Sequence, residues 1–466
     1  MQEDVRKLNR KMTKGSPRVL LVHLFLIFFI PVYGQTDLQS LLTLAENNYP
    51  LIAAKQAEAE AALVNVSLEQ NRLLPSLDAS YQANYSTYNN ITGMSYPGYI
   101  LPISGPPTSE NYNTPVPGSA VSLLIKWEPI TFGQRNSAIE YNRKIYEKQL
   151  AGIADELLRL KFRVAYFYLE MGATGELIKV YNKNIERTEF NLKQSVSLAS
   201  AGLIPAVDSL RFRGELSKAR TELFKLENLF ETQKQELLEL LASSEIKDID
   251  PDDFFAENLP FQPTESIASF ENPMLKMALL ELEASRLRLQ QISRSWVPKL
   301  EFWGTTYARG SGISYNGAID NSNGWSFSRY NYGVGLQLVF PVLDLRSVKL
   351  KTDRQEAFAS SSESYLRQIQ NSLQKEETIA LNNLHTSLLV AKEIPVQFAA
   401  NESAFHALQT RYAAGLTDYS ELIRAQYDLL NAEASLKNAT ISSWKSLLKL
   451  AVIRGDVNIF LNQIKN

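Results

Sequence analysis

Hydrophobic and polar residues alternate along four short segments of the chain. These segments stand beside four prolines: Pro75, Pro129, Pro298 and Pro341. The clearest run of apolar positions is Leu77, Ala79, Tyr81, Ala83 and Tyr85. A period of two predicts β-strands with one apolar face and one polar face. We place the strands at about 76–88, 119–128, 299–307 and 330–340, each close to the ~10 residues that cross a bilayer when tilted.

The four prolines lie at one end of the predicted strands. Proline lacks the N–H that continues a strand ladder, so it suits the point where a chain leaves a sheet. We therefore predict that all four mark one level of the molecule, where strands pass into helices. At the other end, residues 89–118 are rich in proline and residues 308–329 in glycine, serine and asparagine, which predicts exposed loops.

Most of the remaining chain has apolar residues at alternating steps of three and four. One such series is Leu157, Leu160, Val164, Phe167 and Met171. Seams of this kind predict coiled-coil packing of long helices. We place the helices at 133–201, 203–243, 345–413 and 416–453, with a further helix before each pair of strands. The first of them would extend for roughly 100 Å at ~1.5 Å per residue.

The chain repeats itself at an offset of 213 positions, from Ala201-Gly202-Leu203 to Ala414-Gly415-Leu416. The residues that follow match in type, with Asp208 opposite Glu421. The offset predicts a duplicated helix-strand-strand-helix unit. Its parts are a first repeat at 35–243, a connector at 244–271, a second repeat at 272–455 and a C-terminal tail at 456–466.

The connector contains an acidic cluster. Asp248, Asp250 and Asp252 have the spacing that opens a calcium-binding loop, but the glycine at its sixth position is missing and Pro251 interrupts the spacing. We interpret the segment as a solvated connector and expect no metal site.

The first 34 residues form a separate pattern. Six basic residues precede the apolar run Val19 to Val32, and Gly34 follows shortly after. These features predict a secretory signal peptide at 1–34, cleaved after Gly34. Translation from Met1 or from Met12 fits equally, because both starts keep the apolar run. A retained anchor is disfavoured, since the run is shorter than the ~20 residues of a membrane-spanning helix.

Composition narrows the function further. The 466-residue chain has no cysteine and a formal net charge of −2, which becomes more negative when the basic signal peptide is removed. We therefore expect no nucleic-acid binding, no disulfides and no lipoprotein acylation. Three histidines stand apart from carboxylate clusters, and no nucleophile or phosphate-binding motif occurs. We expect no enzyme activity, catalytic residue or cofactor.

Four amphipathic strands predict an oligomer. Their open edges would be costly in lipid, and they are too few to close a barrel. Two copies would supply eight strands, which leave an interior nearly filled by side chains, whereas three would supply twelve and leave a lumen. The polar set that includes Asp78, Gln82, Lys126 and Gln337 suits a wet lumen and favours three copies.

Together these residues resemble the TolC-type outer-membrane efflux proteins. The resemblance rests on the duplicated order, the two Ala-Gly-Leu turns and the segment Pro129-x-x-Phe132-Gly133-x-Arg135. The counterpart in the second repeat departs from the family by having Leu345 where glycine is frequent. The resemblance implies a mixed α and β membrane protein, a homotrimer with a twelve-stranded outer-membrane barrel and a helical tunnel in the periplasm. It also implies a periplasmic adaptor and an inner-membrane RND or ABC transporter as partners, in efflux or type I secretion.

The resemblance also suggests site residues. The turns at Gly202, Leu203, Gly415, Leu416 and Asp418 would be periplasmic tips that dock the adaptor, although the glycines also suit helix ends by themselves. Asp208, Glu421 and Arg424 are candidates for a periplasmic gate. Alternatively, Glu421 and Arg424 form a surface ion pair on one helix.

The main alternative is a periplasmic coiled-coil scaffold or adaptor that does not span the membrane. It would account for the seams and the signal peptide. It would not account for four alternating strands with loops at one end and prolines at the other.

Overall fold

The computed structural model describes residues 37–87, 110, 113–243, 249–263, 272–314 and 316–464. The predicted signal peptide and parts of the connector lie outside the described residues. The chain divides into the units Met1–Gln35 and Thr36–Asn466. All that follows concerns the second unit.

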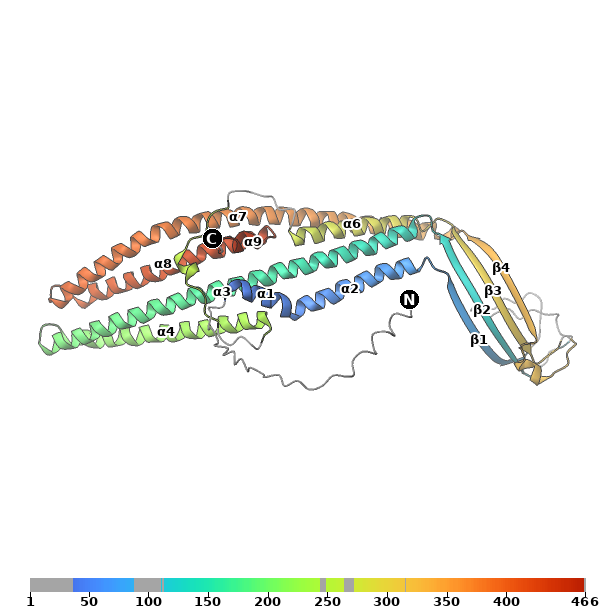
Figure 1. Cartoon of the computed structure of the whole chain (residues 1–466), viewed down its shortest axis with the longest axis horizontal. Coiled ribbons are helices and arrows are strands. Elements are labelled where there is room, and N and C mark those ends of the chain that lie inside the picture. Colours follow the sequence, from blue (N-terminus) through green and yellow to red (C-terminus); the bar gives the residue numbers. More distant parts are fainter. Residues whose placement is uncertain are drawn as a thin grey trace, which may run out of the picture. The chain divides into compact units, whose positions relative to one another are not determined.

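Long helices make up most of this unit (Figure 1). They are α1 (Leu38–Asn48), α2 (Pro50–Asn71), α3 (Gln134–Ser200), α4 (Ala206–Leu241), α5 (Phe254–Glu257), α6 (Pro273–Ser293), α7 (Leu345–Ala413), α8 (Tyr419–Ile453) and α9 (Asn458–Leu461). α3 pairs with α4 and α7 with α8 as two helical hairpins, while α2, α3, α6 and α7 lie side by side toward the strands. Among the described residues, no helix is both long enough and apolar enough to cross a membrane.

Local chemistry explains several helix boundaries that the apolar pattern left open. Pro50 separates α1 from α2, where the sequence predicted one helix. α4 begins only after Pro205, and α8 begins after Asp418, whose side chain accepts a hydrogen bond from the N–H of Glu421. Asn272 caps α6 in the same way. Capping and proline geometry thus shift the observed helix starts inward from the predicted 203 and 416.

The strands form one antiparallel sheet in the order β1-β2-β3-β4. They are β1 (Ser76–Ser86), β2 (Val116–Ile130), β3 (Lys299–Ser311) and β4 (Arg329–Val339). β2 and β3 run further toward the loops than the sequence suggested, because Gly118 and Ser311 still pair with each other. Pro129 lies within β2, where the register with β3 shifts between Trp127 and Ile130. A bulge accommodates proline there, since its missing N–H is not needed for the ladder.

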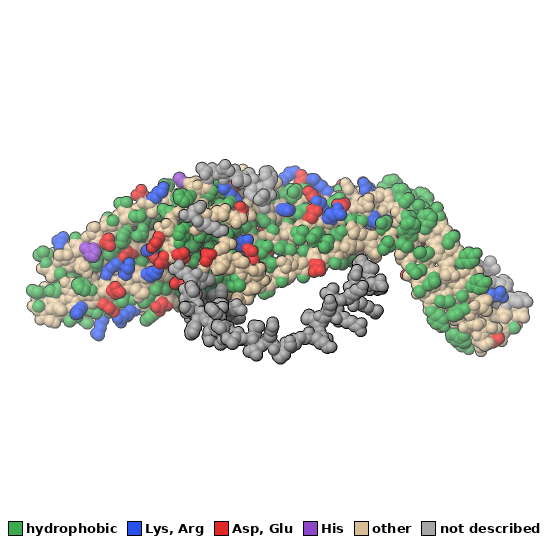
Figure 2. Space-filling model, in the orientation of Figure 1, with side chains coloured by type: hydrophobic (Ala, Val, Ile, Leu, Met, Phe, Trp, Pro, Cys, Tyr) green, Lys and Arg blue, Asp and Glu red, His purple; other side chains and the backbone are tan. Residues whose placement is uncertain are grey.

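The two faces of the sheet differ in chemistry. One carries apolar residues that are unusually exposed, such as Tyr330 at 80%, Tyr332 at 85% and Val334 at 87%. The other face carries Asp78, Gln82 and similar polar side chains on alternate positions. In Figure 2 hydrophobic side chains dominate the visible strand region. β1 and β4 are the edges of the sheet, and α2 and α7, which adjoin them in sequence, are the edges of the helical layer.

The helices enclose two separate hydrophobic clusters. The larger lies near the middle of α3 and the end of α8, around Tyr168, Phe255, Trp444 and Phe460. Phe255 belongs to the connector and Phe460 to the C-terminal tail, so both segments contribute to this core. The connector is therefore not simply solvated, because its Phe255 is buried against Tyr168 of α3 and Trp444 of α8. The smaller cluster lies next to the helical turns.

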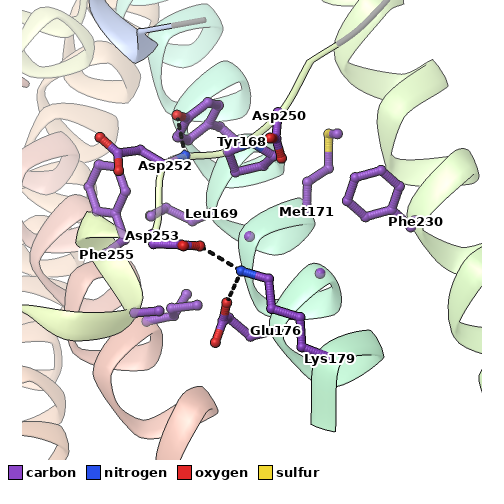
Figure 3. Close-up of a pocket in the computed structure, with 15 residues that line it drawn as sticks. Tyr168, Leu169, Met171, Glu176, Lys179, Phe230, Asp250, Asp252, Asp253 and Phe255 are labelled. Carbon is purple, nitrogen blue, oxygen red and sulfur yellow. Dashed lines mark hydrogen bonds and ion pairs between the residues drawn. The ribbon is translucent and has the colours of Figure 1, made fainter. Parts of the chain in front are cut away.

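The connector crosses α3 beside a small cavity of about 50 Å³ (Figure 3). Lys179 on α3 lies 2.7 Å from Glu176 and 2.7 Å from Asp253 of the connector. Burial alone would lower the pKa of Lys179, but its hydrogen bonds to the two carboxylates outweigh burial and raise that pKa. Tyr168 accepts a hydrogen bond from the N–H of Asp252 at 2.9 Å. The cavity has room for only a few water molecules, and we interpret these contacts as a structural joint.

Candidate functional site at the helical tips

The two Ala-Gly-Leu segments form the same turn between helices. Gly202 and Gly415 adopt positive φ angles of 75° and 70°, which glycine tolerates without strain. The N–H of Leu203 bonds to the carbonyl of Leu198, and that of Leu416 to Arg411, in the six-to-one pattern of a Schellman motif. A Cβ on either glycine would meet nothing within 4 Å, so the backbone conformation alone requires glycine.

Each turn presents a leucine to the surroundings. Leu203 and Leu416 are both 68% exposed. Neither leucine is buried within its own chain, so packing in the single chain does not explain why these positions are apolar. The duplication thus produces two equivalent apolar projections at the ends of the hairpins.

Glu421 and Arg424 are exposed on one face of α8. Among the residues that the structure describes, no ion pair joins them, and Glu421 accepts a hydrogen bond from Thr417. The structure therefore does not contain the surface ion pair between Glu421 and Arg424 that the sequence offered as an alternative. Both side chains are exposed in the single chain.

The third predicted gate residue, Asp208, has a different environment. It is buried in the first turn of α4, with Arg211 3.8 Å away. The structure thus exposes Glu421 and Arg424 on one face of α8, whereas Asp208 is buried.

An aromatic cluster joins the two hairpins near their tips. Phe212 of α4 packs edge-on against Tyr412 of α7 and Tyr419 of α8, with ring centroids 6.0 and 4.8 Å apart. Burial raises the pKa of Tyr412 to about 12, with a further contribution from the negative charge of Asp208. Burial likewise raises the pKa of Tyr419 to about 12. The sequence reasoning did not identify this cluster.

Further from the tips, polar side chains fill the interface between α3 and α8. Gln426 of α8 donates to Asn184 at 2.9 Å and to Thr188 at 2.6 Å, and accepts from Asn191 at 2.9 Å. These residues are buried, and all of them are hydrogen-bonded. The sequence contains a pattern that could have predicted this polar interface. Asn184, Thr188 and Asn191 follow one another at steps of four and three, like the apolar residues of the seam. The hairpins are therefore held together here by polar contacts and not by an apolar core.

A second tight backbone turn lies where β2 passes into α3. Gly133 has a φ of 84°, and a Cβ there would come within 2.5 Å of Nη1 of Arg294. Arg294 bonds to the carbonyl of Gly133 at 3.1 Å, and Arg135 bonds to the carbonyl of Glu128 at 2.7 Å. The Phe-Gly-x-Arg segment is thus a tight corner that arginines hold from both sides. The other junctions place Pro75 and Pro298 directly before β1 and β3, and Pro341 two residues after β4.

A four-stranded sheet continued by duplicated helical hairpins is the fold of several outer-membrane channels. The chain is similar to VceC of Vibrio cholerae, with 13% identity, a TM-score of 0.74 and coverage of 91% of this chain and 97% of that one. It is similar to CmeC of Campylobacter jejuni, with 13% identity, a TM-score of 0.76 and coverage of 91% and 86%. For MtrE of Neisseria gonorrhoeae the identity is 15%, the TM-score 0.73 and the coverage 90% and 89%.

The chain belongs to the outer membrane efflux protein family, whose sequence model matches residues 41–243 and 266–455. No curated protein matches it by sequence. Family membership makes it an outer-membrane transport protein and not an enzyme. It also disfavours the alternative of a periplasmic scaffold.

Proposed function

We propose that three copies of this chain form an exit duct, through which solutes delivered by an inner-membrane pump pass the periplasm and the outer membrane. The observation that carries the proposal is the sheet with one exposed apolar face, one polar face and two unpaired edge strands. Such edges are costly in lipid unless another chain pairs with them. Three sheets of four strands would close a twelve-stranded barrel with a lumen.

The helices support the same assembly. α2 leads into β1 and α7 follows β4, so a neighbour that pairs with the sheet edge also meets the edge of the helical layer. α7 is exposed along most of its length in the single chain, including Leu350, Phe358 and Tyr365, each at least 57% exposed. Contact between α7 and α2 of the next copy would cover this apolar surface.

A polar stripe on α8 is suited to line the duct. Its exposed residues are Glu421, Arg424, Asp428, Asn431, Ser435 and Asn438. They recur at steps of three and four, which places them on one helix face. Asn431, Ser435 and Asn438 of this stripe are uncharged and leave room for water. This stripe fits passive conduction.

Glu421 and Arg424 would lie at the narrow end of this stripe as gate residues. Asp208 would contribute to the gate indirectly, because its charge acts on Tyr412 and Tyr419, which join the two hairpins. The exposed Leu203 and Leu416, with Gly202, Gly415 and Asp418 shaping their turns, would dock a periplasmic adaptor. Three copies would present six similar turns. An efflux pump or a type I secretion transporter fits this arrangement equally.

Disulfide trapping tests the assembly. The chain has no cysteine, so single cysteines at Tyr81 or Ala83 of β1 can be combined with cysteines at Tyr332 or Val334 of β4 without background. Oxidation in outer-membrane fractions should yield covalent trimers for some pairs, and the purified protein should conduct ions in planar bilayers. If every cysteine pair yielded only monomers and the protein did not conduct ions, the duct would be refuted.

A further inference from the structure

Two arginines stand directly opposite each other at the loop end of the sheet. Arg309 of β3 and Arg329 of β4 are register partners, and they close the ladder between these strands. Both side chains are exposed. Like charges placed opposite each other in adjacent antiparallel strands repel and destabilise the pairing.

Both arginines belong to the polar face. Successive side chains of a strand point to opposite faces, so Arg309 shares its face with Tyr307, Thr305 and Trp303. The opposite face carries Ala308 and Tyr330, which continue the exposed apolar row. In the proposed duct the arginines therefore face the lumen and not the lipid.

Within the part of the chain that the structure describes, neither arginine forms an ion pair with a carboxylate. Asp320, in the loop between β3 and β4, is occupied by Ser322 and Asn323, whose hydrogen bonds hold its carboxylate in the loop.

Acids of the polar face lie at the other end of the sheet. Asp78 and Glu301 stand near the helices, close to Lys126 and Lys299. Glu301 is eight positions from Arg309, which separates them by about 26 Å at ~3.3 Å per residue. A neighbouring β1 would not supply a carboxylate at the loop end, since Asp78 is the acid of that strand. Among the described strand residues, the loop end of this face thus carries the two arginines and no acidic side chain.

We propose that Arg309 and Arg329 from three copies form a ring of guanidinium groups that binds solutes carrying phosphate or carboxylate groups at the outer end of the duct. The proposal rests on the function proposed above. Guanidinium groups form paired, charge-assisted hydrogen bonds with such anions. Rings of charged side chains set ion preference in pores. Uncompensated repulsion between the two arginines has no structural benefit in the sheet, which fits a functional role.

Tripolyphosphate is a suitable probe. We expect it to bind the purified trimer in calorimetry, and R309Q/R329Q to weaken binding about tenfold or more. R309K/R329K should retain part of the affinity. The matched control is K126Q/K299Q, which removes two cations from the same face at the helix end and should leave binding unchanged. Because the glutamines relieve repulsion, the arginine variant should fold at least as well as the parent.

Bilayer recordings give the second readout. Tripolyphosphate added on the loop side should block the current, and R309Q/R329Q should remove that block. A trimer that conducts but binds no tripolyphosphate, or loses binding equally in both double variants, would overturn the ring and leave the duct intact. A chain that forms no trimer and does not conduct would overturn the duct, and the ring with it.

Discussion

Arg187 of α3 donates two hydrogen bonds to Glu433 of α8, one from each terminal nitrogen, at 2.8 and 2.5 Å. The pair is mostly buried, with side-chain exposures of 22% and 10%. It lies between the two hydrophobic clusters, where α3 and α8 otherwise meet through amides and hydroxyls. The contact therefore fastens one hairpin to the other at a level where no apolar core does so.

We expect Glu433→Ala to lower the free energy of unfolding by roughly 2–4 kcal/mol, because it leaves the Arg187 guanidinium largely buried without a partner. Denaturant unfolding followed by circular dichroism measures the loss. Glu189→Ala is the control, since Glu189 pairs with Arg220 at 2.6 Å with side chains about half exposed. Its loss should stay below ~1 kcal/mol. Similar losses in both variants would contradict the importance of the buried pair.

Stability at the tips should fall in alkaline solution. Tyr412 and Tyr419 have folded-state pKa values raised to about 12, whereas an unfolded tyrosine ionises near pH 10. The stabilisation is fully present below pH 10 and is lost as the pH rises toward 12, because only the unfolded chain gives up protons there. Unfolding measured between pH 9 and 12, by a probe placed on α7, should show this decline.

Tyr412→Phe should reduce that decline. Its hydroxyl is buried without a hydrogen-bond partner, so its removal should also raise stability at neutral pH by about 1 kcal/mol. A destabilised Tyr412→Phe protein would mean that the hydroxyl has a partner.

Substitution of glycine by alanine should have opposite effects at two positions with open surroundings. Gly415→Ala should destabilise the protein by about 1 kcal/mol because of its positive φ. Gly214→Ala, within α4, should stabilise it by roughly 0.5–1 kcal/mol. The unfolding temperatures of the two single variants test this expectation. A shift of both temperatures in the same direction would be inconsistent with the turn geometry.

The adaptor-docking role of the tips predicts a loss of function without a loss of fold. Leu203→Ser/Leu416→Ser should change stability by less than ~0.5 kcal/mol, because both leucines are exposed. Export through the adaptor and pump should nevertheless fail. Val396→Ser, equally exposed at 68% on the shaft of α7, is the control for lost apolar surface. Normal export by the double variant would refute docking at these leucines.

Much of the fold could be predicted because it depends on periodicity. Alternation over Leu77 to Tyr85 and the seam from Leu157 to Met171 indicated strands and long helices directly. The offset between Gly202 and Gly415 revealed the duplication. These signals are local in sequence and do not require knowledge of tertiary contacts.

The remaining features depend on contacts between distant residues. Phe255 and Phe460 stand in segments without periodicity, and only their contact with Trp444 makes them core residues. The burial of Asp208 was equally hidden, because its match to Glu421 in the repeat suggested a similar position. Corresponding residues of the two halves have diverged in environment although the backbone turns remain alike.

The two unpaired edges, β1 and β4, have a genetic consequence. If each copy completes its neighbours, a copy that reaches the membrane but carries a blocked passage will be built into assemblies with normal copies. Most mixed assemblies would then contain at least one defective member. Co-expression of such a variant with the normal gene should therefore reduce transport well below the level expected from the dose of normal protein.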